Sequence, residues 1–127
     1  MIERYLMPGA PAPRGPYSHA VRAGDFLFIS GVGPLNPETN KFSFGDIRHE
    51  TRVVLTNIQR ILEGCGASMA DVVKCSVFLD DRRDFAAMNE VYAEFFGEAK
   101  PARTTVQVVL PAEDMKVEID CIAYRPL

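Results

Sequence analysis

The sequence predicts a single α+β domain in which a mixed β-sheet carries two helices on one face. Three observations predict this fold. The length of 127 residues fits one domain, spanning residues 1–127, and leaves little room for a second. A composition of 47% hydrophobic and 24% charged residues is typical of a globular chain with a core. Segments with strand and helix patterns follow in the order ββ-α-β-α-ββ, which favours one sheet with both helices packed on the same side.

The N-terminal third predicts an extended leader followed by two strands. Residues 7–16 contain four prolines and two glycines, so we expect an extended segment and no helix there. Residues 17–22 and 26–30 are predicted strands around a turn at residues 23–25. Residues 26–29 are apolar throughout, which predicts a strand that is covered on both faces.

Two helices are predicted from apolar residues that recur at helical spacing. The first spans residues 46–65, with Asp46 as its N-cap and with Gly64 and Gly66 as its stop. The second begins at Asp84 and ends at Gly97. Its apolar side is expected to consist of Phe85, Met88, Val91 or Tyr92, and Phe95.

Three more strands complete the predicted sheet. They span residues 72–79, 103–110 and 116–124, and a capping box at Ser68 and Asp71 precedes the first of them. The face of the sheet that carries no helix would present Ser76, Phe78, Ile122 or similar residues, depending on register. Because a broad apolar face is rarely left in water, we expect it to be buried in a homo-oligomer.

Charge and cysteine content narrow the class of protein. The net charge of −3, without a basic stripe, argues against a dedicated nucleic-acid binder. The three cysteines include no C-x-x-C pair, so we expect buried thiols, no disulfide framework and a reducing, cytoplasmic location. No apolar run is long enough to span a bilayer, and no signal peptide is apparent. His19 and His49 lack ligand-like spacing, so no metal site is expected.

Four polar residues stand at positions where apolar ones would be expected. Arg103 begins a strand, Glu118 lies inside one, Ser30 ends one, and Tyr17 starts another. Each also has an ordinary structural interpretation. Arg103 and Glu118 would then be solvated surface charges, Ser30 a turn residue, and Tyr17 part of the core or of an interface.

Together these residues fall within a set of motifs that resembles one family. The chain is similar to the reactive intermediate deaminase family, also called the YjgF or L-PSP endoribonuclease family. The motifs run in family order over nearly the whole chain: Gly15-Pro16-Tyr17-Ser18, Phe28-Ile29-Ser30-Gly31, Leu35-Asn36-Pro37-Glu38-Thr39, Val77-Phe78-Leu79, Asp84-Phe85-x-x-Met88-Asn89-x-x-Tyr92, Pro101-Ala102-Arg103-Thr104 and Val117-Glu118-Ile119.

The resemblance implies a chorismate-mutase-like fold and a homotrimer whose sheets form an inner barrel, with a cleft at each subunit interface. It implies that Arg103 binds the substrate carboxylate and that Glu118 is the other catalytic residue. Tyr17, Ser30, Asn89 and Thr105 would complete the substrate site. Two residues depart from common family members: Thr105 stands where many have cysteine, and Val32 where many have glutamine. Threonine in place of cysteine would be acceptable at position 105 if only the backbone of that residue contacts the substrate.

The implied activity is hydrolysis of 2-imino or enamine acids, such as 2-iminopropanoate, to 2-oxo acids and ammonia. Guanidinium suits a carboxylate because it donates two parallel hydrogen bonds. Glu118 could take a proton from the attacking water and return one to the departing nitrogen, so no metal or organic cofactor is expected. Two alternatives stay open: a non-catalytic module that binds 2-oxo acids, and an endoribonuclease or translation inhibitor, which the acidic balance disfavours.

Overall fold

Within the described part of the chain, the fold is a six-stranded sheet with two α-helices on one side. The computed structural model describes residues 2–127. The strands, in chain order, are β1 (Ile2–Tyr5), β2 (Ala20–Ala23), β3 (Phe26–Val32), β4 (Val72–Leu79), β5 (Ala102–Gln107) and β6 (Val117–Tyr124). In the sheet they are ordered β1-β2-β3-β6-β4-β5. β4 and β5 run parallel, whereas the other neighbouring pairs are antiparallel, so the sheet is mixed as predicted.

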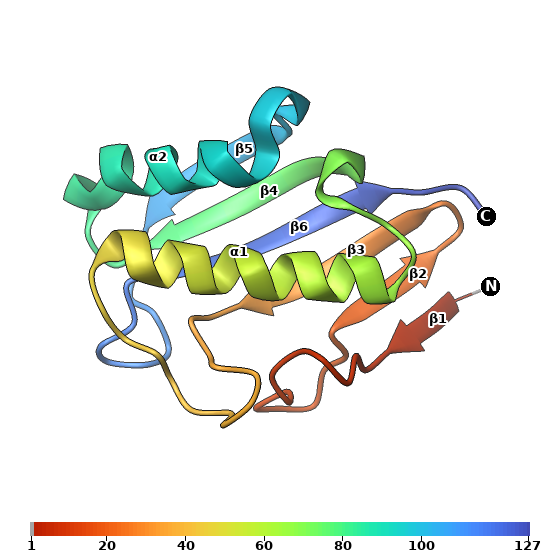
Figure 1. The fold of residues 1–127 in the computed structure, drawn as a ribbon, viewed down its shortest axis with the longest axis horizontal. Coiled ribbons are helices and arrows are strands. Elements are labelled where there is room, and N and C mark those ends of the chain that lie inside the picture. The colour runs from red at the N-terminus through yellow and green to blue at the C-terminus, as the bar shows by residue number, and fades with distance from the viewer. Residues whose placement is uncertain (1) are drawn as a thin grey trace.

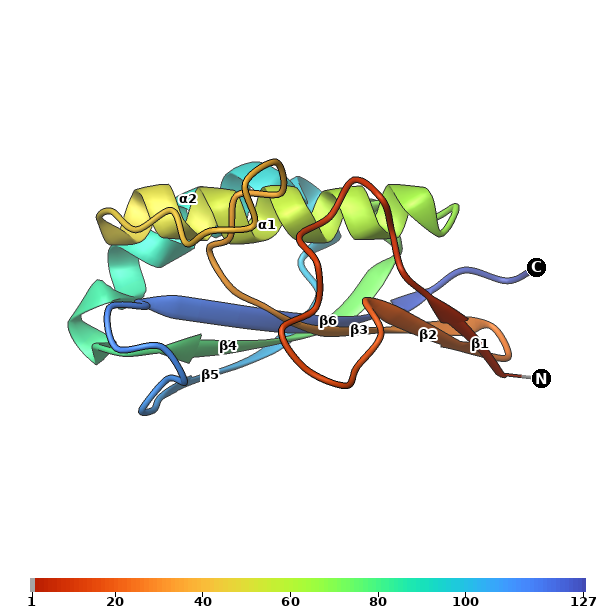
Figure 2. The same cartoon turned by 90° about the horizontal axis from the view of Figure 1, so that it is seen from below.

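Both helices lie on the same face of this sheet. α1 spans Ile47–Gly64 and α2 spans Phe85–Phe96, and in Figure 1 both lie in front of the strands. The view from below shows the two helices as one layer and the sheet as a second layer, with no helix on the other side (Figure 2). The Asp46 carboxylate caps α1 by accepting a hydrogen bond from the His49 amide at 2.8 Å. The predicted capping box at Ser68 and Asp71 is also present.

Alternation along the strands separates a buried face from an open one. In β6 the odd-numbered residues from Val117 to Ala123 are buried beneath the helices, whereas Glu118, Asp120 and Ile122 face the side without helices. The core consists of the inward residues of the sheet and the apolar stripe of α1, including Leu27, Val54, Leu55, Ile58, Leu62, Cys75, Val77, Ile119 and Cys121. Phe28 and Val106 remain 44% and 41% exposed on the open face.

An irregularity in β3 places two functional candidates. The pairing of β3 with β6 shifts between Ile29, which faces Cys121, and Val32, which faces Ile119. Two residues of β3, Ser30 and Gly31, therefore stand opposite one residue of β6. Such a bulge bends a strand and redirects its side chains, and it is often found beside a functional site.

Several predicted details were wrong. β1 was not predicted, because its four residues carry little apolar signal. β2 begins at Ala20 and not at residue 17, because the Tyr17 amide bonds locally to the Gly15 carbonyl oxygen and not across a strand pair. β5 ends at Gln107 and not at residue 110. Phe85 is exposed, Phe95 is half-buried against the core, and Phe96, which was not predicted, is buried. Residues 26–29 are buried on only one face, since Phe26 and Phe28 are exposed. Over residues 2–127 no helix is long and apolar enough to cross a membrane.

Candidate functional site

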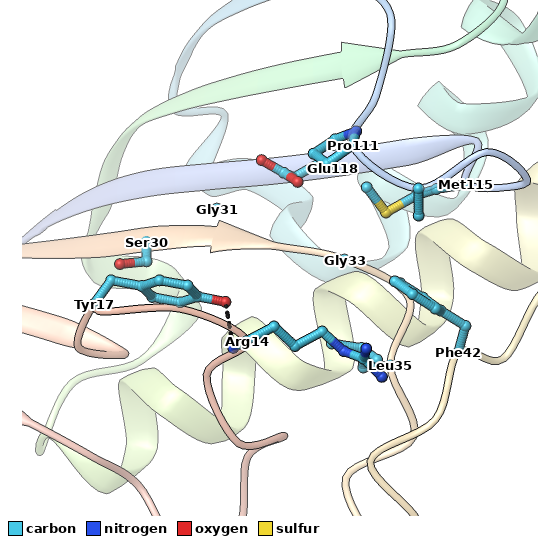
Figure 3. A pocket seen from close by; sticks show the side chains of 11 residues that line it. Arg14, Tyr17, Ser30, Gly31, Gly33, Leu35, Phe42, Pro111, Met115 and Glu118 are labelled. Atoms are coloured by element: carbon cyan, nitrogen blue, oxygen red, sulfur yellow. Dashed lines mark hydrogen bonds between the residues drawn. The ribbon is translucent and has the colours of Figure 1, made fainter.

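A cavity opens where β3 ends and β6 begins. It has a volume of about 590 Å³. Tyr17, Ser30 and Glu118 all line it, so the structure brings together three of the predicted site residues. Figure 3 shows Tyr17, Ser30 and Arg14 along one side and Glu118, Pro111 and Met115 along the other. We call Tyr17, Ser30 and Glu118 the Glu118 group.

The Glu118 side chain lies directly over the backbone of Gly31. A Cβ atom at Gly31 would overlap Glu118 Oε2 and would lie 3.1 Å from Glu118 Cδ. Burial raises the pKa of Glu118, and the nearby negative charge of Asp120 raises it further. A carboxyl group with a raised pKa exchanges protons more readily near neutral pH, which suits general acid–base chemistry.

The leader that carries Tyr17 is anchored by a buried histidine. His19 Nδ1 accepts a hydrogen bond from the Met7 amide at 2.7 Å, and His19 Nε2 lies 2.6 Å from the Pro11 carbonyl oxygen. Because Nδ1 accepts, Nε2 must carry the proton and donate it to that carbonyl. The neutral imidazole thus fixes residues 7–11 against the start of β2. This anchoring role of His19 was not predicted from the sequence, in which His19 was weighed only as a metal ligand.

Ser30 and Tyr17 are both engaged in local hydrogen bonds. The Ser30 hydroxyl donates to the Ser18 carbonyl at 2.7 Å, which ties the leader to β3. The Tyr17 hydroxyl accepts from the Arg14 amide at 3.1 Å and keeps its own proton for another acceptor. Both side chains are therefore fixed at the edge of the cavity.

Arg103 lies elsewhere, between β5 and α2. Its guanidinium carbon stands 4.7 Å from the centre of the Tyr92 ring and 5.5 Å from that of Phe85. Cation–π contacts of this kind hold a guanidinium by its face and leave its edge free to donate hydrogen bonds. Within residues 2–127, the Arg103 side chain forms no hydrogen bond and no ion pair, so its donors are available to a ligand.

Polar atoms without partners gather near Arg103. Asn89 Oδ1 and Thr105 Oγ1 are buried and have no hydrogen-bond partner, and the buried Tyr92 hydroxyl has only the Cys75 thiol, a weak partner, beside it. Asn89 and Tyr92 are one turn apart on α2, while Arg103 and Thr105 share the face of β5 that points toward the helices. Burial raises the pKa of Tyr92 well above its usual value, so its hydroxyl stays protonated. We call Arg103, Asn89, Tyr92 and Thr105 the Arg103 group.

One chain cannot bring the two groups together. Glu118 pairs with Phe78 across β4, whereas Arg103 pairs with Cys75, three residues away along the same strand. Strand geometry therefore separates their backbones by about 10 Å along the strands and by about 10 Å across two strand spacings. Glu118 also points to the open face, whereas Arg103 points to the face with the helices.

Three cavity residues were not predicted from the sequence, and the cysteines and histidines form no further site within residues 2–127. Arg14, Phe42 and Met115 line the cavity, yet they belong to loops in which no periodic pattern marks them. Cys75 and Cys121 are buried, as expected, and burial raises the pKa of both thiols. In the part of the chain that the structure describes, no three His, Cys, Asp or Glu side chains converge in a way that could hold a metal ion.

Comparison with known proteins identifies the family. The family model described as endoribonuclease L-PSP matches residues 7–125. A RutC family protein of Pyrococcus horikoshii is 52% identical over 125 residues, which cover 98% of this chain and 99% of that protein. The chain belongs to the RidA/YjgF/L-PSP family. The resemblance found in the sequence is thereby confirmed.

Two further members of the RidA/YjgF/L-PSP family bear on function and fold. A protein of the mite Dermatophagoides farinae, named 2-iminobutanoate/2-iminopropanoate deaminase, is 43% identical over 91% of this chain and 90% of its own length. The crystal structure of RidA from the Antarctic bacterium Psychrobacter sp. matches with a TM-score of 0.88 and 41% identity, over 95% of this chain and 99% of that one. The α+β fold of the family is therefore present here.

Proposed function

We propose that this protein hydrolyses 2-imino acids to 2-oxo acids and ammonia at a site completed by two copies of the chain. The main support for the proposal is that the Arg103 group and the Glu118 group lie apart within one chain. Each group has half of what the reaction needs: the Arg103 group has an unpaired guanidinium for a carboxylate, and the Glu118 group has a carboxyl with a raised pKa for proton transfer. The mite relative's name supports the same reaction class.

The proposed assembly is a homotrimer. The open face of the sheet leaves Phe26, Phe28, Val106 and Tyr124 between 41% and 45% exposed, which is unfavourable in water. Contact between copies would cover this face. A ring of copies can also set the Arg103 group of one chain against the Glu118 group of the next, because these are two different surfaces.

In the proposed reaction, Arg103 holds the substrate carboxylate and orients the imine carbon toward a water molecule. Water adds across the C=N bond, its oxygen becomes the 2-oxo group, and the nitrogen leaves as ammonia. Glu118 accepts a proton from the water and returns one to the nitrogen. Asn89 Oδ1 and Thr105 Oγ1, which have no partner within the chain, supply hydrogen-bonding atoms for the substrate, and the Tyr92 hydroxyl lies beside them.

The test is an imine-hydrolysis assay of Arg103→Ala and Arg103→Lys. The imine is made in the reaction vessel by oxidising L-alanine, and the enzyme's effect is read as faster ammonia release. Loss of a charge-assisted contact worth about 1.5–3 kcal/mol should lower kcat/KM roughly ten- to a hundredfold in the alanine variant. The lysine variant keeps the charge but lacks the paired geometry, and it should recover only part of the activity.

Two results would contradict the proposal. One is near-normal ammonia release by a folded Arg103→Ala protein. The other is a wild-type protein that 2-oxo acids protect against melting but that does not accelerate imine loss, which would favour a binding module. As a control we choose Arg4→Gln, because Arg4 is exposed on β1, at the edge of the sheet farthest from β5.

A further inference from the structure

Arg14 places a second guanidinium at the cavity that contains Glu118. Its Nη2 donates to the Asn40 carbonyl oxygen at 2.8 Å, and its guanidinium carbon lies 4.7 Å from the centre of the Phe42 ring. The Arg14 amide is also tied to the Tyr17 hydroxyl. The side chain is thus held in place although it is exposed, and Figure 3 shows it extending along the cavity from Tyr17 toward Leu35 and Phe42.

These contacts leave most of the guanidinium unused. An arginine side chain has five N–H donors, and the bond to Asn40 requires one of them. The ion pairs found within residues 2–127 involve other cations, and none includes Arg14. Joining the leader to residues 40–42 therefore uses only some of the N–H donors of Arg14.

The cavity separates its two charged groups with apolar walls. Arg14 and Glu118 are the charged side chains of the lining, and Leu35, Phe42, Pro111 and Met115 make up much of the remainder. A three-carbon imino acid displaces only a few water molecules of about 30 Å³ each. It would leave much of the 590 Å³ unoccupied. The lining instead suits a longer molecule with an apolar middle and an anionic end.

We propose that Arg14 selects 2-imino acids whose side chain ends in a second carboxylate. The inference rests on the proposed function and deepens it by naming the substrate class. Arg103 of one copy would hold the carboxylate beside the imine, and Arg14 of the next would hold the distal one. The distal carboxylate takes no part in the reaction: water still replaces the C=N nitrogen, which leaves as ammonia.

The test compares three imines made in the reaction vessel by oxidases suited to each amino acid. L-alanine gives a short imine, L-norvaline a five-carbon imine without a second charge, and L-glutamate a five-carbon imine with one. The wild-type protein should have the highest kcat/KM on the glutamate-derived imine. Arg14→Gln should lower the ratio of kcat/KM on the glutamate-derived imine to that on the norvaline-derived imine by roughly tenfold, because Arg14 is exposed and its contact is partly screened. Arg14→Lys should restore part of the ratio.

The outcomes separate this inference from the proposed function. If none of the imines is hydrolysed faster than without protein, the proposed function fails. The role of Arg14 is overturned if the alanine-derived imine is hydrolysed but the wild-type kcat/KM is no higher on the glutamate-derived imine than on the norvaline-derived one. It is also overturned if Arg14→Gln keeps the wild-type preference for the glutamate-derived imine. Arg4→Gln should leave the ratio unchanged. Melting curves of each variant show whether the protein is folded, and the wild-type comparison stands even if Arg14→Gln is not.

Discussion

Glycine at position 31 provides the space that the Glu118 carboxyl occupies. Its φ angle lies outside the left-handed region, so alanine fits the backbone there, but the added Cβ would overlap Glu118 Oε2. The atoms that must move belong to the end of a flexible side chain. We therefore expect Gly31→Ala to fold with an almost unchanged melting temperature and to lose roughly tenfold in kcat/KM, since small displacements of a catalytic group are costly.

A matched control for this prediction is Gly9→Ala. Gly9 also has an ordinary φ angle, and a Cβ there would meet no atom within 4 Å. Both variants should melt alike, and only Gly31→Ala should lose activity. Equal imine hydrolysis by the two variants would show that the position of the Glu118 carboxyl over Gly31 has no catalytic importance.

At the scale of residues, the sequence showed which side chains could take part in catalysis better than it showed which of them lie close together. Glu118 was recognisable because a carboxylate interrupts an apolar strand, and it does line the cavity. Arg14 was not, because its leader has no periodicity and its contacts with Asn40 and Phe42 join segments more than twenty residues apart. The unpaired atoms of Asn89 and Thr105 are likewise visible only after α2 has packed beside β5.

The first turn of α1 connects a helix to the loop that borders the cavity. Glu50 is fully buried, and its carboxylate accepts hydrogen bonds from the Lys116 amide at 2.8 Å and from the Gly45 amide at 3.2 Å. Glu50→Ala would leave both part-buried amides, and the Lys116 ammonium that lies 3.5 Å from the carboxylate, without this acceptor. We expect a loss of about 3 kcal/mol in the free energy of unfolding, measured by denaturant titration.

Two companion variants define this role. Glu50→Gln keeps one acceptor oxygen, so about half of the lost stability should return. Glu63→Ala removes an exposed carboxylate from the same helix and should change stability by less than about 0.5 kcal/mol. If Glu50→Ala and Glu63→Ala unfold at the same denaturant concentration, Glu50 does not hold the helix to the start of β6.

Elements with strong periodicity were predictable, and elements made by tertiary contact were not. The stripe of α1 and the alternation in β4 and β6 follow from the sequence, because one face of each is buried. β1 forms because β2 offers it an edge, and its own residues, Ile2–Tyr5, show no such alternation. The parallel pairing of β4 with β5 depends on the α2 crossover between them, which propensity alone does not specify.

At the scale of the whole molecule, the fold leaves two incomplete groups and one uncovered face. The apolar residues of that face need a partner surface, and the Arg103 and Glu118 groups lie too far apart to act within one chain. An assembly of copies would cover the apolar face. It would also complete the site if the Arg103 group of one copy lay against the Glu118 group of the next. This account predicts that a defect in one group can be complemented by a chain with a defect in the other.

Mixed assemblies of Arg103→Ala and Glu118→Gln chains test this account. Each variant alone should be nearly inactive, because every junction lacks one group. In a one-to-one mixture refolded together, about a quarter of the junctions should combine an intact Arg103 with an intact Glu118, and a matching share of wild-type activity should return. Mixing without refolding should restore less, since exchange of subunits is then slow. If the refolded mixture is no more active than its components, Arg103 and Glu118 do not share a site across copies. Recovery of activity would place both residues at the same junction, and it would explain why Arg103 is unpaired in the single chain.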